Sequence, residues 1–460
     1  MPRLLSLLLY FLLILAISPS HAQSSVTSDF SSYQDEAQQI IDTALNDQEA
    51  FDRLTYFVDK FGHRFSGSEN LENSIDWIVS EMKKQPFDDV KTQEVMVPHW
   101  VRGEESATLL APRKKDLPML GLGGSIGTSE GGIEAEVLVV DSFQDLQQKA
   151  DRAKGKIIVY NVPFTTYGET VQYRYRGGIE AAKVGGVASL IRSVTPYSMQ
   201  TPHTGNSSYE EGIKKVPQAA ITLEDATLLH RLQKQGANIK IRLSMNAKTL
   251  PDVQSRNVIA EIKGSEKPEE IVVLGGHIDS WDVGQGAMDD AGGCFAAWEA
   301  VMLMRKLGLS PKRTVRVVMW TNEENGLRGA TAYRDMVKKN GTVDNHVLAI
   351  ESDGGVFKPR GFGFGGSDKG YQMVSAVAEL LESIGSDVVN RGGGGADIGP
   401  IMREGVPGMG VLVDGSRYFW YHHTAADTID KLDEREYQQS IATMAVMAFV
   451  IADADQTLAR

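Results

Sequence analysis

The second half of the chain alternates between short, continuous apolar runs and longer segments whose apolar residues recur every three or four positions. The short runs at 271–276, 315–320 and 346–351 are rich in Val, Ile and Leu, as buried strands are. The longer segments at 292–308 and 437–454 have the length and spacing of helices packed on a sheet. This alternation predicts an α/β fold in which helices flank a mixed, mostly parallel sheet on both faces.

The first half of the chain has a different texture. Residues 30–86 read as amphipathic helices, and residues 90–98 read as a strand. Between about 112 and 252, glycine-rich turns separate short apolar strands and helix-like stretches, and no cluster of metal-ligating side chains occurs. We therefore predict an inserted smaller domain at 112–252, which splits the main domain into residues 23–111 and 253–460.

The first 22 residues read as a signal peptide. Arg3 supplies a positive charge, residues 4–17 form an apolar run, and positions 20–22 are a cleavage site of the small-x-small type. An apolar run of 14 residues is shorter than the roughly 20 that a membrane-spanning helix needs, so cleavage is favoured over an anchor. The single cysteine, Cys294, lies in an apolar helical segment, where we expect a buried thiol. A periplasmic or secreted protein without a membrane span follows.

Charge narrows the function classes further. The 460 residues include 60 Asp or Glu and 47 Lys or Arg, so the formal net charge is −13. A nucleic-acid-binding protein needs a basic face to neutralise phosphates, and this composition argues against one. The chemistry of the chain must therefore be sought in individual side chains at the ends of the predicted strands.

Five segments at strand ends and turns carry His or carboxylate side chains, in the order His, Asp, Glu, Asp, His. His277, Glu324 and Asp353 follow three apolar runs, whereas Asp289 lies in a glycine-rich turn and His423 in a late loop. In open α/β sheets, ligands bind outside the carboxyl ends of the strands. Each segment alone is weak evidence, but the complete set predicts one site at that edge of the sheet.

Imidazole nitrogens and carboxylate oxygens are zinc ligands, and two ions about 3.5–4 Å apart form a hydrolytic pair. We assign Asp289 as the bridge, His277 and Asp353 to one ion, and Glu324 and His423 to the other. Asp290 in place of Asp289 as the bridge remains open. The nitrogen and oxygen ligands also accept cobalt or manganese.

Two further carboxylates adjoin these ligands. Glu323 is not needed as a ligand, and we predict that it is the general base that takes a proton from water and passes it to the leaving amine. Asp279, two residues beyond His277, is expected to hold that imidazole in its tautomer. Asp427 could orient His423 or cap a helix.

The segments GGHIDSWDVGQGAMDDAGG, WTNEENG, IESDGG and WYHHTAADT resemble the co-catalytic dizinc aminopeptidase and glutamate carboxypeptidase family. The twelve-residue step from His277 to Asp289 and the paired glutamates carry the resemblance. It implies the zinc exopeptidase fold, a protease-associated-like inserted domain and, in the carboxypeptidase branch that matches best, hydrolysis of dipeptides or short peptides. Many relatives have Tyr before the last His; here that residue is His422, and Tyr421 precedes it, so the oxyanion donor stays open.

Rival functions remain at this stage. The enzyme could be an aminopeptidase that releases N-terminal residues from longer peptides. A non-catalytic binding relative would lose ligands or the base, and the glutaminyl cyclase branch uses one zinc, so the complete set argues against both. Arg391 and Arg417 are candidate partners of a substrate carboxylate, and Asp397 is either a substrate contact or a turn residue. A peptide is the expected partner, and a homodimer is left open.

Overall fold

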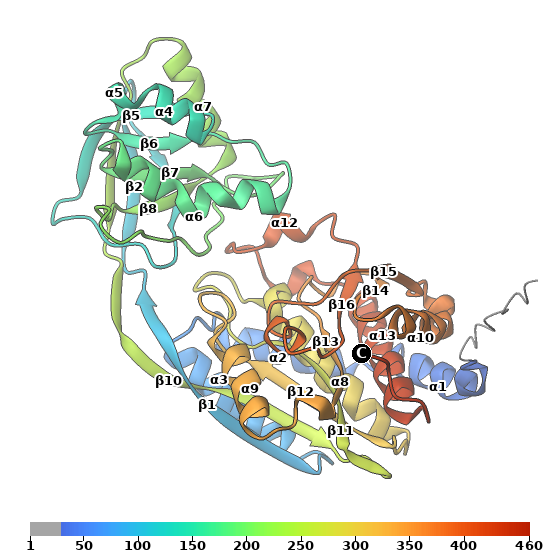
Figure 1. Cartoon of the computed structure of the whole chain (residues 1–460). Coiled ribbons are helices and arrows are strands. Elements are labelled where there is room, and N and C mark those ends of the chain that lie inside the picture. Colours follow the sequence, from blue (N-terminus) through green and yellow to red (C-terminus); the bar gives the residue numbers. More distant parts are fainter. Residues whose placement is uncertain (1–28) are drawn as a thin grey trace, which may run out of the picture.

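The computed structural model describes residues 29–460, so the predicted signal peptide at 1–22 lies outside the described residues. The chain forms two α/β units, each built around an eight-stranded sheet. Two long paired strands, β1 (Asp89–Val101) and β10 (Lys248–Ile262), connect the units and are called the ribbon below (Figure 1). The main domain contains the residues before β1 and after β10, together with the ribbon itself. The inserted domain is formed by the residues that lie between β1 and β10 in the sequence.

The main-domain sheet has the strand order β1-β10-β12-β11-β13-β16-β14-β15. Its centre, from β12 to β16, is parallel, whereas the ribbon strands pair antiparallel, as does β14 with β16. The predicted mixed sheet with parallel strands is confirmed. Besides the ribbon, its strands are β11 (Lys267–His277), β12 (Arg313–Trp320), β13 (His346–Glu351), β14 (Pro359–Gly365), β15 (Val388–Arg391) and β16 (Gly408–Val413).

Helices cover both faces of this sheet, as predicted. One face packs against α1 (Gln34–Ala44), α2 (Glu49–Phe61), α3 (Glu69–Met82), α8 (Gly292–Lys306), α10 (Asp368–Ala378) and α13 (Glu434–Asp453). The other face packs against α9 (Arg328–Lys339) and α11 (Gly399–Met402). Short helical turns occur at η1 (Ser31–Tyr33), η2 (Ala287–Ala291), η3 (Val343–Asn345), η4 (Glu379–Ile384), α12 (Tyr418–Tyr421) and η5 (Ile429–Lys431). No helix within residues 29–460 is both long and apolar enough to cross a membrane.

The last helix, α13, lies in the larger core. Its sequence is apolar on every side, and such a helix is stable only when protein surrounds it. Apart from Gln439, every residue from Tyr437 to Ala452 is buried, and α13 packs against α8 and α1. The side chain of Asp433 accepts a hydrogen bond from the backbone N–H of Glu436 at 2.9 Å and so caps the first turn. α8 also buries Cys294, in agreement with the expected structural thiol.

The inserted domain has its own sheet, in the order β3-β2-β9-β5-β6-β7-β8-β4. The strands from β5 to β8 are parallel, and the remaining neighbours pair antiparallel. Its strands are β2 (Glu105–Ala111), β3 (Lys115–Leu117), β4 (Met119–Gly121), β5 (Ile133–Val140), β6 (Ile157–Tyr160), β7 (Ala188–Arg192), β8 (Gln218–Ile221) and β9 (Lys240–Met245). Its helices are α4 (Phe143–Gln148), α5 (Ala150–Ala153), α6 (Tyr167–Lys183) and α7 (Leu223–Lys234).

The inserted domain begins and ends earlier than the expected bounds of 112 and 252. β2 pairs with β3 and β9, so residues 105–111 belong to the inserted sheet. Residues 248–252 belong to β10, which pairs with β1 along the whole ribbon. Gly103, at a φ of +66°, turns the chain out of β1. The two strands beside this turn join different sheets only through their pairing with the distant β10 and β9, which the local sequence does not show.

Candidate metal centre and substrate cavity

The five predicted ligands converge at the carboxyl ends of the central strands. His277 is the last residue of β11, Glu324 follows β12, and Asp353 follows β13. Asp289 lies in the η2 turn between β11 and α8, and His423 lies just after α12. Because parallel strands end at one edge of the sheet, these separate segments meet there.

Asp289 lies between the other four side chains. Its Oδ1 is 3.1 Å from His277 Nε2, and its Oδ2 is 3.5 Å from His423 Nε2. His277 Nε2 is also 3.3 Å from Asp353 Oδ1, and His423 Nε2 is 3.1 Å from Glu324 Oε2. Each half of the cluster thus has one imidazole and one carboxylate of its own, and the halves share Asp289.

The electrostatics of the cluster fit divalent cations. Burial raises the pKa of Glu323 to about 8, and burial together with the charge of Asp289 raises the pKa of Glu324 well above its usual value. Burial and the Arg174 guanidinium hold the pKa of His423 well below its usual value, so this imidazole is neutral. Asp289 Oδ2 is buried without a hydrogen-bond partner. The neutral His423 imidazole beside crowded carboxylates suits zinc, whose charge relieves the repulsion among the carboxylates.

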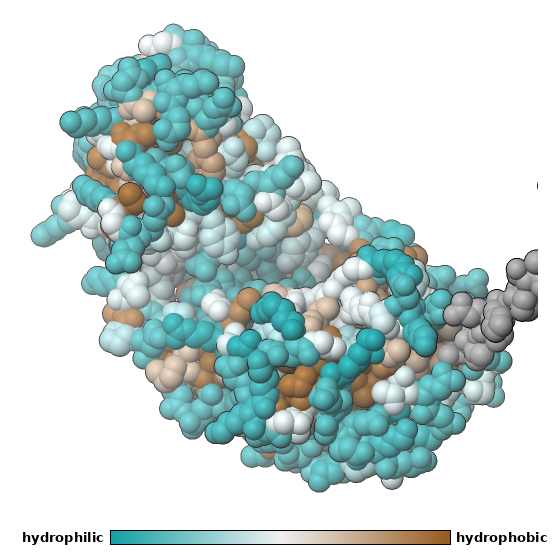
Figure 2. Space-filling model, viewed as in Figure 1, coloured by the Kyte–Doolittle hydropathy of each residue, from teal (hydrophilic) through white to brown (hydrophobic). Residues whose placement is uncertain are grey.

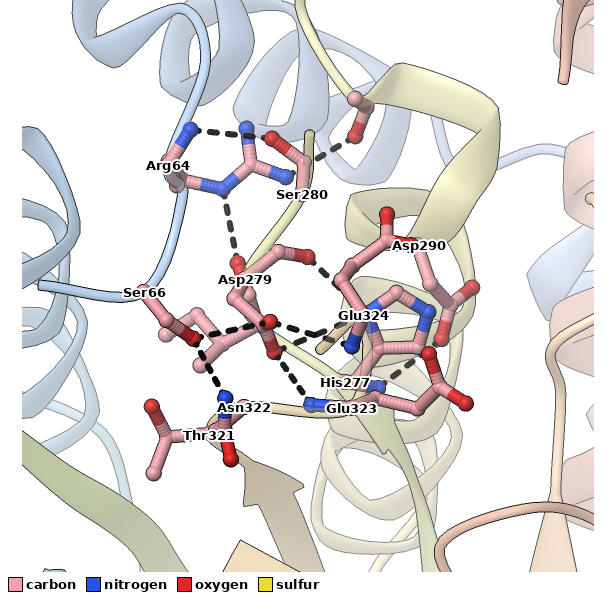
Figure 3. Close-up of polar contacts among 12 residues, drawn as sticks. Arg64, Ser66, His277, Asp279, Ser280, Asp290, Thr321, Asn322, Glu323 and Glu324 are labelled. Atoms are coloured by element: carbon pink, nitrogen blue, oxygen red, sulfur yellow. Dashed lines mark hydrogen bonds and ion pairs between the residues drawn. The ribbon is translucent and has the colours of Figure 1, made fainter. Parts of the chain in front are cut away.

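The orientation of His277 is fixed by the main chain. Its Nδ1 donates to the carbonyl oxygen of Asp279 at 2.9 Å, so Nε2 faces the cluster. The expectation that the Asp279 carboxylate holds this imidazole is therefore corrected, because the nearest carboxylate oxygen is 3.8 Å away. That carboxylate instead accepts hydrogen bonds from the backbone N–H groups of Glu323, at 3.0 Å, and Glu324, at 3.3 Å (Figure 3). Asp279 thus links two segments that supply ligands.

Two buried side chains hold the segment between His277 and Asp289. Nothing in the sequence pointed to the first, Arg64, and the role of the second, Asp427, was left open. Arg64 donates to the carbonyl oxygens of Ile278, at 2.8 Å, and Gly286, at 2.9 Å. Asp427 accepts hydrogen bonds from the backbone N–H groups of Ala287, Met288 and Asp289 at 2.8–3.2 Å. Asp427 therefore shapes the Asp289 turn, rather than orienting His423 or capping a following helix.

The two neighbouring aspartates have different surroundings. Asp290 Oδ2 accepts a hydrogen bond from the His277 backbone N–H, and Oδ1 accepts one from Gly293, both at 3.1 Å. A Cβ atom at Gly276 or Gly293 would lie 2.1 or 2.4 Å from this carboxylate, so only glycine fits at both positions. Asp290 joins the β11 end to α8, whereas Asp289 faces both imidazoles.

A cavity of about 370 Å³ opens over the cluster, where the inserted domain meets the main domain. The space-filling view shows the molecule hollowed between the two units (Figure 2). Besides Asp289, Glu323, Glu324, Asp353 and His423, its walls include His422 and Tyr418 of the main domain and Tyr167, Arg174, Tyr175 and Asn206 of the inserted domain. Tyr421 does not line this cavity; its ring packs against the larger core. Of the two expected oxyanion donors, only His422 faces the space.

The inserted domain approaches the cluster closely. The Thr204 backbone N–H donates to the carbonyl oxygen of His423 at 3.0 Å. Arg174 is 3% exposed, and it donates to the carbonyl oxygen of Thr204 at 3.3 Å and to Tyr167 Oη at 2.9 Å. Its Nε has no hydrogen-bond partner, and no carboxylate within residues 29–460 forms an ion pair with it. A buried guanidinium without a counter-ion therefore faces the cavity.

The arginines expected to bind a carboxylate lie elsewhere. Arg391 is exposed and pairs with Asp368, and Arg417 Nη2 lies 2.8 Å from Glu436 Oε2. Both guanidinium groups already have an acidic partner, and neither lines the cavity. The sequence of α6 offers no comparable signal for Arg174, because its RYR stretch reads as an exposed helical face.

Comparisons with known proteins agree with this geometry. Residues 257–448, which contain every candidate ligand, match the sequence model of Peptidase family M28. Carboxypeptidase Q of Xenopus laevis is 48% identical over 438 residues, which are 95% of this chain and 93% of that protein. Carboxypeptidase Q of Homo sapiens is 46% identical over 438 residues, which are 95% and 92% of the two chains.

Solved structures show the same architecture. The crystal structure of a Peptidase M28 precursor from Shewanella amazonensis SB2B has a TM-score of 0.89 and 34% identity, over 93% of this chain and 98% of that one. BSAP, a zinc aminopeptidase from Bacillus subtilis, has a TM-score of 0.66 at 22% identity, over 89% and 96%, and shows the fold alone. The resemblance inferred from the motifs is confirmed. Because the match to carboxypeptidase Q spans both domains, this chain belongs to peptidase family M28 and is a zinc-dependent exopeptidase.

Proposed function

We propose that this enzyme hydrolyses dipeptides and short peptides at a centre of two zinc ions. Asp289 would bridge the ions, His277 and Asp353 would hold one, and Glu324 and His423 would hold the other. The observation that carries this assignment is the position of Asp289, whose two oxygens face two different imidazoles. Bound zinc would polarise the scissile carbonyl group and lower the pKa of a water molecule.

Glu323 is proposed as the general base. Its side chain lines the cavity, while its backbone N–H is held by Asp279, so the carboxylate stays beside the ligands without being one. Burial raises its pKa to about 8, which suits a group that takes a proton from the attacking water and delivers it to the leaving amine nitrogen. His422, which faces the same cavity, is proposed as a hydrogen-bond donor to the carbonyl oxygen as negative charge develops on it.

Arg174 supports a substrate with a free carboxylate close to the scissile bond. A buried cation without an acidic partner is costly, and a carboxylate that enters the cavity would remove that cost. The Arg174 guanidinium lies 3.5 Å from His423 Nδ1. A substrate carboxylate bound to Arg174 would therefore belong to the residue next to the scissile bond. A dipeptide meets this requirement, as does a longer peptide cut at its last peptide bond, whereas a longer peptide cut at its first peptide bond has its carboxylate too far along the chain.

The main alternative is an aminopeptidase that releases N-terminal residues from longer peptides. The name of the Bacillus subtilis neighbour favours it, and the same metal centre would serve it. A non-catalytic relative is disfavoured, because Glu323 and all five ligands are present. A panel of free dipeptides, N-acetylated dipeptides, dipeptide amides and longer peptides separates the two activities. Fast cleavage of free dipeptides alone supports the proposal, and efficient trimming of long peptides would replace it with the alternative.

We further propose a periplasmic or secreted location. The support is the signal-peptide pattern of residues 1–22 together with a chain that needs no disulfide, since its one cysteine is buried. Fractionation of cells that express the full chain, with the mature N-terminus sequenced, tests this location. A homodimer remains a hypothesis that sedimentation of the purified protein would test.

A further inference from the structure

A second cavity adjoins the metal centre. Its volume is about 380 Å³, and Asp353 lines both this cavity and the one over the ligands. Asp353 belongs to the half of the cluster that contains His277, whereas Arg174 lies beside His423 in the other half. A substrate whose carboxylate meets Arg174 therefore places its amino-terminal residue toward Asp353 and the second cavity.

The walls of the second cavity are mostly bare main chain. Seven of its twelve lining residues are glycines, including the run Gly392–Gly395. Gly393 has a φ of +148°, and a Cβ atom there would lie 2.1 Å from the carbonyl oxygen of Gly363. The run thus lies directly on β14, and it contributes no side chains that would fill the space. Leu412, whose Cδ2 lies beside Gly363, adds apolar surface.

The polar end of this cavity is acidic. Glu351 is 1% exposed; its Oε2 accepts a hydrogen bond from the Ile398 backbone N–H at 2.7 Å, and its Oε1 has no hydrogen-bond partner. A Cβ atom at Gly395 would lie 2.1–2.3 Å from this carboxylate, so glycine is required for the carboxylate to reach the wall. Asp397 does not line the cavity; it is 1% exposed, and both of its carboxylate oxygens also lack hydrogen-bond partners. No Lys, Arg or His within residues 29–460 forms an ion pair with either group.

We propose that the second cavity binds the side chain of the substrate residue on the amino side of the scissile bond, and that Glu351 selects a side chain with a cationic end. The inference rests on the proposed function, which brings a short peptide to the metal centre. The methylene groups of a lysine or arginine side chain would contact the glycine walls and Leu412. The cationic end would give Glu351 the partner that it lacks, which is favourable in a buried site.

The test compares Lys-Ala with norleucine-Ala, because norleucine keeps the methylene chain but lacks the ammonium group. For the zinc-loaded enzyme, kcat/KM for Lys-Ala should exceed that for norleucine-Ala at least tenfold. In Glu351→Gln the ratio should fall to below about threefold. The matched control is Glu266→Gln, an exposed residue just before β11, at the end of that strand away from His277, and it should keep the wild-type ratio.

Two results would overturn the proposal. The first is a wild-type ratio near one while both dipeptides are hydrolysed, which would leave the proposed function intact. The second is an equal loss for both substrates in Glu351→Gln, which would make Glu351 a support for the Ile398 turn alone. A zinc-loaded enzyme that cleaves no dipeptide would refute the proposed function instead. The same Lys and norleucine comparison on tripeptides would then decide the subsite.

A second variant tests whether the substrate side chain occupies the second cavity, and it leaves the charge of Glu351 unchanged. Leu412→Trp would add bulk to a half-buried wall residue of the cavity. It should lower kcat/KM for norleucine-Ala relative to Gly-Ala at least tenfold, because glycine places no side chain in the cavity. An unchanged ratio between these two substrates would show that the cavity does not receive the side chain.

Discussion

Replacing Arg174 by Gln would test how the enzyme recognises the carboxyl end of its substrate. Removal of one partner of a buried, hydrogen-bonded charge pair costs about 2–5 kcal/mol. The guanidinium already donates to Thr204 and Tyr167, and its Nε lacks a partner, so part of its hydrogen-bonding capacity remains for substrate. We therefore expect the lower part of that range, about 2–3 kcal/mol, which is roughly a 30- to 150-fold loss in kcat/KM.

The assay is a two-by-two cycle of enzyme and substrate. Wild-type enzyme and Arg174→Gln are each measured on a free dipeptide and on the corresponding dipeptide amide. Wild type should prefer the free dipeptide by the factor above, and the variant should discriminate less than about threefold. Arg174→Lys should recover part of the preference, because it restores the charge but not the planar pair of N–H donors.

The loss of the Arg174 contact with the substrate carboxylate must be separated from any disturbance of His423. Arg174 and the Nδ1 atom of His423 both lie near the carbonyl oxygen of Thr204, so the substitution could disturb a proposed ligand. Zinc content of the variant is therefore measured alongside activity. If the variant keeps its zinc and loses the same factor on the free dipeptide and on the amide, Arg174 does not bind the substrate carboxylate.

Three further predictions concern the metal centre. Asp289→Ala should lose both zinc ions, because the bridge serves both, and elemental analysis that finds two ions per chain would refute the assignment. Glu323→Gln should keep zinc yet lose about 10²–10⁴ in kcat, whereas Glu324→Gln should lose zinc first; similar behaviour of the two variants would contradict the separate roles. In the metal-free protein, burial raises the pKa of Glu323 from 4.5 to about 8, so the folded state binds a proton that the unfolded chain releases. The stability of the chelated protein should therefore fall as pH rises from about 4.5 to 8, and zinc should weaken this dependence; thermal unfolding with and without chelator measures both.

The sequence was sufficient to predict that these His and carboxylate side chains lie together, because its signals are local. His277, Glu324 and Asp353 each follow an apolar run closely, and parallel strands bring such positions to one edge of the sheet. The mixed α/β fold was predictable for the same reason. Periodicity identifies the strands and helices, and their alternation along the chain implies parallel strands.

What the sequence could not supply depends on contacts between distant segments. Arg174 lies on a helix of the inserted domain, and it becomes part of the cavity only because residues 203–206 pack against the loop at His423. Asp279 was correctly placed near His277, but spacing alone cannot tell whether a residue acts through its carbonyl oxygen or its carboxylate. The domain boundary was missed because β1 and β2 follow each other across Gly103, and only their pairing with the distant β10 and β9 separates the two sheets.

Within residues 29–460, the chain passes between the two domains only at Val101–Glu105 and Met245–Lys248, yet both domains form walls of the substrate cavity. The proposed zinc ligands and Glu323 all belong to the main domain, whereas Arg174, Tyr167 and Asn206 belong to the inserted one. The proposed recognition of the substrate carboxylate thus belongs to a different domain from the proposed bond cleavage and side-chain selection. Exchange of the inserted domain between relatives, at the end of the ribbon where Val101 pairs with Lys248, would provide a route to a new preference at the carboxyl end of the substrate while the proposed metal centre stays in place.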